Sequence, residues 1–414
     1  MLFLAVHAWY WRLVVVDPGV GFGDVGLYQL WAWQSLETGT WPVLDSPWVY
    51  PALAVVPVTL PGLASTVEWE PYASAWLGLV TTANAAATVV LSRRSWLGGV
   101  WFVAYLALLG PVAFGRIDAF AVPIAVVGLL AAARRPRVAA ALLTVGAWIK
   151  VAPGVLVLPL LAVARNRVRD VVVPAGLVSL AVVGLVAAGG GLRNIASFAA
   201  AQEGRGLQLE AVAASGWVAQ WITGGPAEAV YNEGLVTWEV RGNGTALTAD
   251  LLGWLLPITV VALCWLTWRA RGRLPDAELL AWSGLALTLA LVVTNKVGSP
   301  QFLAWLAAPV ALGLAGWARQ GADDGDPLGS PARLPWLDWP LVAVWSLALA
   351  GLTHVVFPIG YFPLVEGEPL VGWVLVARNA LLLGLFVAAV VRLVVGQGAE
   401  APRPADDEPS AQPS

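Results

Sequence analysis

Long apolar runs, each of about twenty residues, recur along this chain and constrain its fold more than any other feature. A helix of that length spans the ~30 Å hydrocarbon core of a bilayer, where helices and closed barrels alone satisfy their backbone polar groups. Of the 414 residues, 59% are hydrophobic and only 12% are charged. We therefore predict an all-α, polytopic integral membrane protein rather than the few soluble domains usual at this length.

The apolar runs are the candidate spans. They are 2–16, 50–66, 72–92, 96–113, 117–133, 138–164 (broken at Pro153), 170–188, 250–268, 277–294, 300–317, 338–357 and 370–395. We expect about 11–13 transmembrane helices. The first run lacks a basic start and a small-residue cleavage site, which argues against a cleaved signal peptide. Because that run is short for a span, its helix is expected to begin upstream of residue 1.

Arginines mark one side of the predicted membrane domain, and acids mark the other. The arginine clusters that follow apolar runs are Arg134, Arg135 and Arg137, then Arg165, Arg167 and Arg169, then Arg269, Arg271 and Arg273. Acids collect in the connections 17–49 and 189–249. By the positive-inside bias the arginine clusters are cytoplasmic. Both acidic connections are then predicted to face outward from a bacterial plasma membrane, in which the protein is multi-pass.

One problem of parity stays open. If 50–66 and 72–92 both cross the membrane, Arg93 and Arg94 fall on the outer side, against the bias. Either one of the two segments is re-entrant, or 96–113 contains two short crossings.

The domain organisation is simple. Residues 1–396 are predicted to form a single transmembrane domain, with a polar cytoplasmic linker at 319–336. The Pro-, Ala- and acid-rich stretch 397–414 is predicted to be a disordered cytoplasmic tail. In the outer connection, 192–222 has some helical amphipathicity and is expected to lie in the membrane interface.

Asp24 and Tyr28 are the first candidate site residues. They are four residues apart, so a short helix over 24–36 places them on one face. The neighbouring glycines Gly21, Gly23 and Gly26 leave the backbone around the carboxylate permissive. The alternative is structural, because an Asp before an apolar helix is a common N-cap. One residue can serve both roles.

The two lysines are more informative. Of the 23 basic residues only Lys150 and Lys296 are lysines, and both lie at or inside apolar runs, in WIKVAP and TNKVGSP. An ammonium group at membrane depth is costly, so it suggests a function with an anionic partner. A proline shortly afterwards breaks the helix, as happens where a chain lines a cavity. The alternative, stronger for Lys296, is a side chain that snorkels to the interface.

Further polar residues interrupt apolar sequence. Arg116 and Asp118 in FGRIDAF mark a turn on the acidic side, and Arg378 and Asn379 form a buried polar pair. The chain has no Walker-type loop, no Cys/His metal cluster, no Ser-His-Asp candidate and no nucleotide-sugar motif. A nucleotide donor, a metal and a nucleic-acid partner are therefore not expected.

Sugar transfer from a lipid phosphate would use three features together. They are a carboxylate outside the membrane, cations at the membrane edge and a lipid-facing cavity. The carboxylate takes the proton of an acceptor hydroxyl. The cations stabilise the phosphate leaving group. Inversion requires one carboxylate on the acceptor side rather than a close pair.

The order of motifs resembles the family-87 glycosyltransferases of the GT-C fold, which include polyprenyl-phosphate-mannose-dependent mannosyltransferases. The similar stretches are GDVGLYQLW, WVYPALAVVP, AAALLTVGAWIKVAPGVLVLPLL, NKVGSPQFLAWL and VARNALLLGLF, which together cover most of the chain in the expected order. The family's acid before a tyrosine matches Asp24 and Tyr28, and its lysine before a helix-breaking proline matches Lys150 and Pro153. The usual Tyr-Pro-Pro and Gly-Gln appear here as Tyr50-Pro51-Ala52 and Gly115-Arg116.

The resemblance implies a role for each candidate residue. Asp24 is implied to be the general base. The substrate-binding candidates are Tyr28, Arg116, Lys150, Lys296, Ser299 and Gln301. The implied donor is a polyprenyl-phosphate hexose, mannose in the first instance, and it serves as substrate with no separate cofactor. The acceptor is a glycolipid or glycan, and the other partners are membrane lipids.

Two functions compete with this one. A transporter or flippase of a lipid-linked glycan also uses intramembrane cations and broken helices. It has no need of an acid held between the first two helices. A lipid-linked oligosaccharide polymerase is the third alternative, and the few arginines in the outer connections argue against it.

Overall fold

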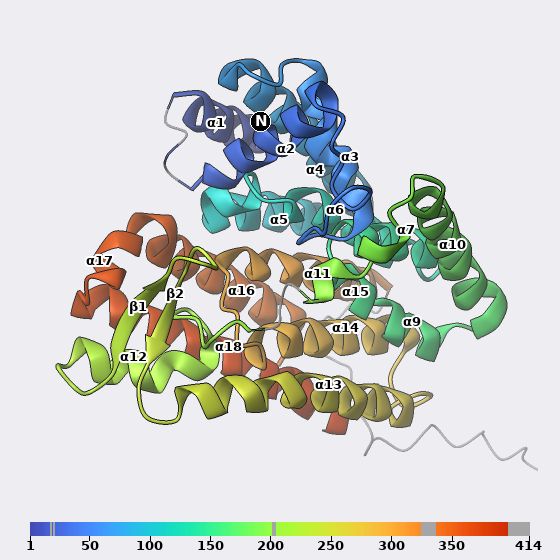
Figure 1. Cartoon of the computed structure of the whole chain (residues 1–414). Coiled ribbons are helices and arrows are strands. Elements are labelled where there is room, and N and C mark those ends of the chain that lie inside the picture. The colour runs from blue at the N-terminus through green and yellow to red at the C-terminus, as the bar shows by residue number, and fades with distance from the viewer. Residues whose placement is uncertain (17–18, 20, 201–203, 324–336, 396–414) are drawn as a thin grey trace, which may run out of the picture.

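The computed structural model describes residues 1–16, 19, 21–200, 204–323 and 337–395. They are mostly helical (Figure 1). Within them, eight segments are long and apolar enough to cross a membrane. These segments contain α4 (Trp69–Ser92), α5 (Trp96–Leu109, continued by 3₁₀ helix η3, Gly110–Ala113), α10 (Val173–Ala188), α13 (Thr245–Arg269), α14 (Asp276–Val293), α15 (Ala307–Asp323, preceded by 3₁₀ helix η7, Pro300–Leu306), α16 (Trp339–His354) and α18 (Pro369–Val395). The polytopic helical prediction is therefore confirmed.

Shorter apolar helices complete the bundle. They are α1 (Leu2–Val16), α3 (Val55–Thr59, flanked by the 3₁₀ turns Ala52–Ala54 and Leu60–Leu63), α6 (Asp118–Ala131), α7 (Pro136–Ile149), and α8 and α9 (Ala152–Val155 and Val157–Val163). In the chain, helix α2 (Gly23–Glu37) follows α1 and precedes α3. Each predicted apolar run thus contains helix. The break predicted at Pro153 falls three residues earlier, at Lys150, between α7 and α8.

Local signals explain where several of these helices begin and end. Proline occupies the first position of α7 and α18, where its missing N–H costs nothing. Helix α5 ends at Gly110, which has φ +77°. A Cβ there would lie 2.6 Å from the His354 ring, so this close approach of α16 requires glycine.

The parity problem is resolved by contacts between α1 and α4. The Trp69 indole, at the start of α4, donates to the carbonyl of Val14, at the end of α1 (3.1 Å). Farther along the pair, Trp11 donates to Ser74 (3.1 Å). The two helices are therefore antiparallel neighbours, and the chain between them returns to the side from which it left.

These contacts favour the alternative in which segment 52–63 is re-entrant. It is only roughly 18 Å long at 1.5 Å per residue, too short for the hydrocarbon core. Residues 96–113 form one continuous helical segment, so the second alternative is wrong. Arg93 and Arg94, at the end of α4, then lie with the other arginine clusters.

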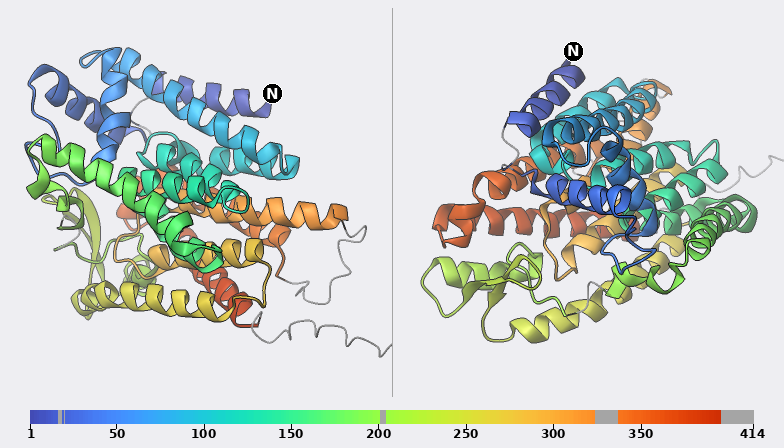
Figure 2. Two further views of the ribbon diagram at one scale, coloured as in Figure 1. Left: turned by 90° about the vertical axis from the view of Figure 1, so that its right-hand side faces the viewer. Right: turned by 45° about the horizontal axis from the view of Figure 1, so that its top comes forward.

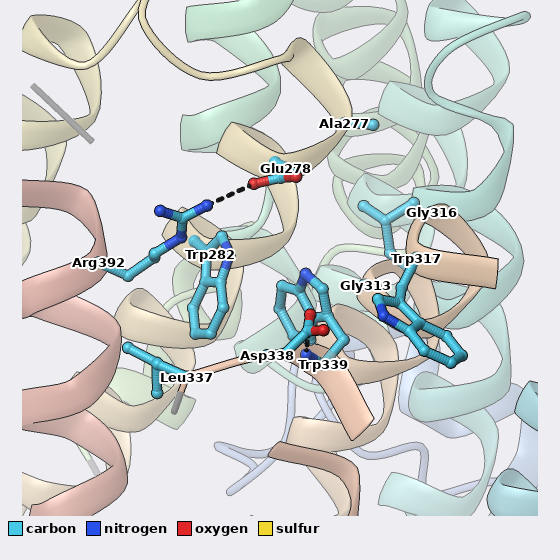
Figure 3. A pocket seen from close by; sticks show the side chains of 11 residues that line it. Ala277, Glu278, Trp282, Gly313, Gly316, Trp317, Leu337, Asp338, Trp339 and Arg392 are labelled. Carbon is cyan, nitrogen blue, oxygen red and sulfur yellow. Dashed lines mark hydrogen bonds and ion pairs between the residues drawn. The ribbon is translucent and has the colours of Figure 1, made fainter. Parts of the chain in front are cut away.

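The arginine clusters meet at one end of the molecule. A cavity of about 650 Å³ there is lined by Arg94, Arg165, Asp170 and Asp276 and by apolar residues of α6, α9, α14 and α15. Glu278 of α14 and Arg392 of α18 form an ion pair at 3.0 Å (Figure 3). Nearby, the Trp339 ring packs directly on Gly313. A Cβ at position 313 would lie only 2.1 Å from this ring. We call this the arginine end.

The acidic connections meet at the opposite end. Asn194 donates to the carbonyl of Val43 (3.0 Å), and Ser197 bonds the backbone of Trp48 in both directions (2.8 and 2.9 Å). In Figure 2 (left) the N-terminus and the hairpin of the longer connection lie at opposite ends of the bundle. We call this second end the acidic end.

The longer acidic connection does not form one continuous helix. It contains α11 (Ser197–Ala200), α12 (Ser215–Ile222) and a hairpin of β1 (Glu228–Asn232) and β2 (Thr237–Arg241), an exception to the all-α prediction. Leu207 and Leu209 bond the backbone of β2 and are buried in a hydrophobic cluster with α12 and α18. Their apolar side chains thus face the protein instead of lipid.

Several sequence-based expectations lie outside the described residues. They are the disordered tail 397–414, most of the linker 319–336, Glu203 and the turn at Asp17.

The orientation of the bundle leads to a first prediction. Cysteines introduced at Glu37 and Glu228, both exposed at the acidic end, should react with an impermeant maleimide added to intact cells. The positive-inside bias is the physical reason. The native thiol, Cys264, is replaced by serine first. The matched control is Ala133→Cys at the arginine end, which should react only after lysis. The reverse pattern would overturn the orientation.

Candidate functional site

Both lysines line one cavity at the acidic end. Its volume is about 520 Å³, and α11, α13, α14 and the breaks after α7 and α14 contribute its walls. Most of the lining is apolar, and the exceptions include Tyr50, Lys150, Thr294, Asn295 and Lys296. Cavities of this size and composition bind amphipathic ligands through a few placed polar groups. We call it the lysine cavity.

Lys150 reaches the cavity because the helix breaks there. It follows the last residue of α7 with extended backbone (φ −149°, ψ 131°), and Pro153 lies within α8. Its Nζ lies 3.6 Å from a carboxylate oxygen of Asp118 and 4.9 Å from the centroid of the Tyr50 ring. The anionic partner expected for this lysine is therefore Asp118.

Asp118 is a residue of the candidate site that the sequence did not single out. It was placed only at a turn, yet it is 1% exposed and lies in the first turn of α6, where the helix dipole favours a negative charge. The Trp305 indole, on the cavity wall, donates to its Oδ1 (2.6 Å). The available signal was a carboxylate two residues after an arginine within apolar sequence.

Lys296 lies in the loop between α14 and η7. Gln208 holds this loop twice: its backbone N–H donates to the Lys296 carbonyl (3.0 Å), and its side-chain oxygen accepts from Gly298 N–H (3.1 Å). A Cβ on Gly298 would lie 2.1 Å from the Glu210 backbone, so this approach requires glycine. Among the described residues Lys296 forms no ion pair, and it faces the cavity.

Asp24 forms an ion pair with Arg116. Helix α2 begins one residue earlier, its N-cap is Phe22, and no side chain caps it. The N-cap interpretation of Asp24 is therefore wrong. The two side chains remain partly accessible, at 29% for Asp24 and 16% for Arg116. A carboxylate held by an arginine and still reachable from solvent can receive a substrate group.

Tyr28 does not line the cavity. It is fully buried, its hydroxyl lies 3.2 Å from that of Tyr50, and it accepts from the Ile117 backbone N–H (3.2 Å). Its position four residues after Asp24 therefore serves to support Tyr50 and the turn 115–118.

The turn 115–118 links the two charge pairs. Arg116 contacts Asp24, and Asp118 contacts Lys150. The partly exposed carboxylate and the lysine cavity are thus fixed by residues two positions apart in one turn.

The remaining candidates lie beside the cavity. Ser299 precedes η7 as its N-cap without a side-chain hydrogen bond, and Gln301 has a buried Oε1 with no partner among the described residues. Among those residues, no group of three or more His, Cys, Asp or Glu is placed to hold a metal ion.

Glu210 gave no sequence signal beyond its charge. It is 8% exposed, in the connection outside the membrane spans. Burial raises its pKa to about 7, and the positive charges of Arg378 and Arg116 only partly oppose the shift. Arg378 also donates to the Glu210 carbonyl (2.7 Å), and Asn379 to that of Ala211 (3.3 Å). The buried polar pair of α18 therefore fixes this segment.

The raised pKa of Glu210 predicts a pH-dependent stability. Between pH about 4.5 and 7 the folded protein keeps a proton that the unfolded chain has lost, so stability falls as pH rises. Glu210→Gln removes this loss, which amounts to roughly 3 kcal/mol at most. The difference in Tm between variant and wild type in detergent should be more positive at pH 8 than at pH 5. The exposed Glu228→Gln is the control, and equal differences at both pH values would refute the prediction.

Comparisons with known proteins identify no family. No protein-family model matches the chain, and no curated protein matches it. Among solved structures, it is similar to the crystal structure of ArnT from Cupriavidus metallidurans in the apo state, with 14% sequence identity and a TM-score of 0.44. That similarity covers 96% of this chain and 76% of the other. The residues of the site therefore carry the functional interpretation.

Proposed function

We propose that this protein is a GT-C-type membrane glycosyltransferase. It transfers a hexose, mannose in the first instance, from a polyprenyl phosphate to a lipid or glycan acceptor at the outer face of the membrane. The observation that carries the proposal is the lysine cavity: the only two lysines of the chain line one largely apolar cavity. A ligand with an anionic head and a hydrocarbon tail suits this lining, because the lysines can bind the head and the apolar residues the tail.

Each charged group has a role in the reaction. Lys150 and Lys296 bind the phosphate and stabilise the charge that develops as the bond from sugar C1 to the phosphate oxygen breaks. Lys150 exchanges part of its contact with Asp118 for the phosphate. Asp24 accepts the proton of the acceptor hydroxyl as its oxygen forms the new bond to C1. Polyprenyl phosphate leaves from the opposite face, so the configuration at C1 is inverted.

The direct test is a transfer assay. Purified protein is incubated with labelled polyprenyl-phosphate-mannose and a membrane lipid extract, and a labelled lipid or glycan product is expected. The matched control is the Lys296→Gln protein, which should give much less product at the same donor concentration. Absence of product with the wild-type protein, across extracts and donor sugars, would refute the proposal.

A second cavity favours a transporter of a lipid-linked glycan as the alternative. The cavity of the arginine end is lined by α6, α9, α14 and α15. A smaller pocket lined by α6, α14 and α15, with Leu156 and Thr288 among its residues, also shares Ala152 and Trp305 with the lysine cavity. Cavities on both faces along shared helices suit alternating access. Movement of labelled lipid across proteoliposomes, without a transfer product, would select this alternative.

A further inference from the structure

Three buried polar side-chain atoms on segments near the lysine cavity have no partner among the described residues. They are Arg116 Nε, Glu210 Oε1 and Gln301 Oε1. Such groups are rare in native proteins and usually meet an ordered water or a ligand. Leaving a buried donor or acceptor unmatched costs about 1–3 kcal/mol. One hydrogen-bond donor, Arg116 Nε, and two acceptors, Glu210 Oε1 and Gln301 Oε1, can therefore bind a polar partner.

These atoms belong to three segments of the chain. The charges of Arg116 and Glu210 are near enough for each to shift the pKa of the other, and both shift the pKa of Tyr361. The backbone of Glu210 packs directly on Gly298, three residues before Gln301. The unmatched atoms thus belong to the turn 115–118 and to the two segments that meet at Gly298.

These segments also form the rest of the site. Arg116 holds Asp24, the proposed base. The loop that contains Gly298 contains Lys296, which lines the cavity. The unmatched atoms therefore belong to the segments that also carry the partner of the proposed base and one of the proposed phosphate ligands.

We propose that Glu210, Gln301 and Arg116 form the subsite for the hexose of the donor. Sugar hydroxyls donate to the carboxylate of Glu210 and the amide oxygen of Gln301, and a sugar oxygen accepts from Arg116 Nε. A hydroxylated ring supplies donors and acceptors together, as this mixed set requires. The inference rests on the proposed function and assigns the sugar to side chains distinct from the lysines that hold the phosphate.

Binding of two lipids separates the sugar from the phosphate. The probes are polyprenyl phosphate and the same lipid carrying mannose, titrated into purified full-length protein in detergent. Glu210→Gln keeps the shape of the side chain and removes its charge and one acceptor. We expect it to weaken binding of the mannosylated lipid by about tenfold to a hundredfold. Binding of the bare polyprenyl phosphate should change by less than about twofold.

Two further variants complete the design. Gln301→Leu removes an acceptor without changing charge, and should repeat the pattern if Glu210→Gln fails to fold. Lys296→Gln should weaken both lipids. Equal weakening of both lipids by the subsite variants, or none, would overturn the subsite and identify the unmatched atoms as water sites. Failure of the wild-type protein to bind either lipid would instead overturn the proposed function.

Discussion

Asp24→Asn is expected to lower the rate of sugar transfer by about 10² to 10⁴, the usual effect of losing a general base. Asparagine has the same size and cannot accept the proton of the attacking hydroxyl. Because Phe22 and not Asp24 is the N-cap, the substitution removes no capping bond. It does remove the charge that faces Arg116, so Tm is measured together with transfer. Binding of the donor lipid should persist.

The control for Asp24 is another carboxylate of the same connection. Asp45 accepts from the Trp41 backbone N–H in an exposed turn (2.7 Å), so Asp45→Asn should leave transfer nearly unchanged. Near-normal transfer by Asp24→Asn together with loss in Asp45→Asn or Asp17→Asn would identify a different base. If none of the three substitutions matters, the enzyme interpretation fails and the transporter is the better account.

Replacing either cavity lysine should weaken binding of the donor lipid. Lys296→Gln is expected to raise the KM for the donor by about tenfold to a hundredfold, or to abolish turnover, because a hydrogen bond to a charged phosphate contributes about 1.5–3 kcal/mol. Lys296 forms no ion pair among the described residues, so its replacement leaves none of their carboxylates without a cation partner. The measurement is the donor dependence of transfer, with Arg165→Gln at the arginine end as the control.

Lys150 needs a compensated variant. Lys150→Gln alone leaves the Asp118 carboxylate, 1% exposed, without its cation, and breaking a buried pair typically costs about 3–5 kcal/mol. The double variant Lys150→Gln/Asp118→Asn removes both charges and should fold while still binding the donor weakly. Unchanged donor kinetics in well-folded lysine variants would mean that these side chains only snorkel to the interface.

The sequence by itself determined the helical membrane architecture and indicated several residues of the candidate site. The length of an apolar run decides whether a helix can cross a bilayer, and proline breaks a helix whatever surrounds it, so these features are local. The helix break after Lys150 was predictable for this reason. The end shared by the acidic connections was predictable from the separation of arginines and acids along the chain. The scarcity of lysine pointed to Lys150 and Lys296 because an ammonium at membrane depth is costly wherever it occurs.

Only the tertiary structure decided which of these charges meet. Asp24 and Arg116, and Asp118 and Lys150, are far apart in the chain, and their pairing depends on how α2, α6 and α7 pack. The side on which Arg93 falls depended on the contact of Trp69 with Val14, since run length alone does not separate a re-entrant helix from a span. Glu210 resembles any other loop acid in sequence, and its burial follows from the contacts of its backbone with Arg378 and Gly298. Charge pairing and burial are properties of the packed helices, and no local pattern encodes them.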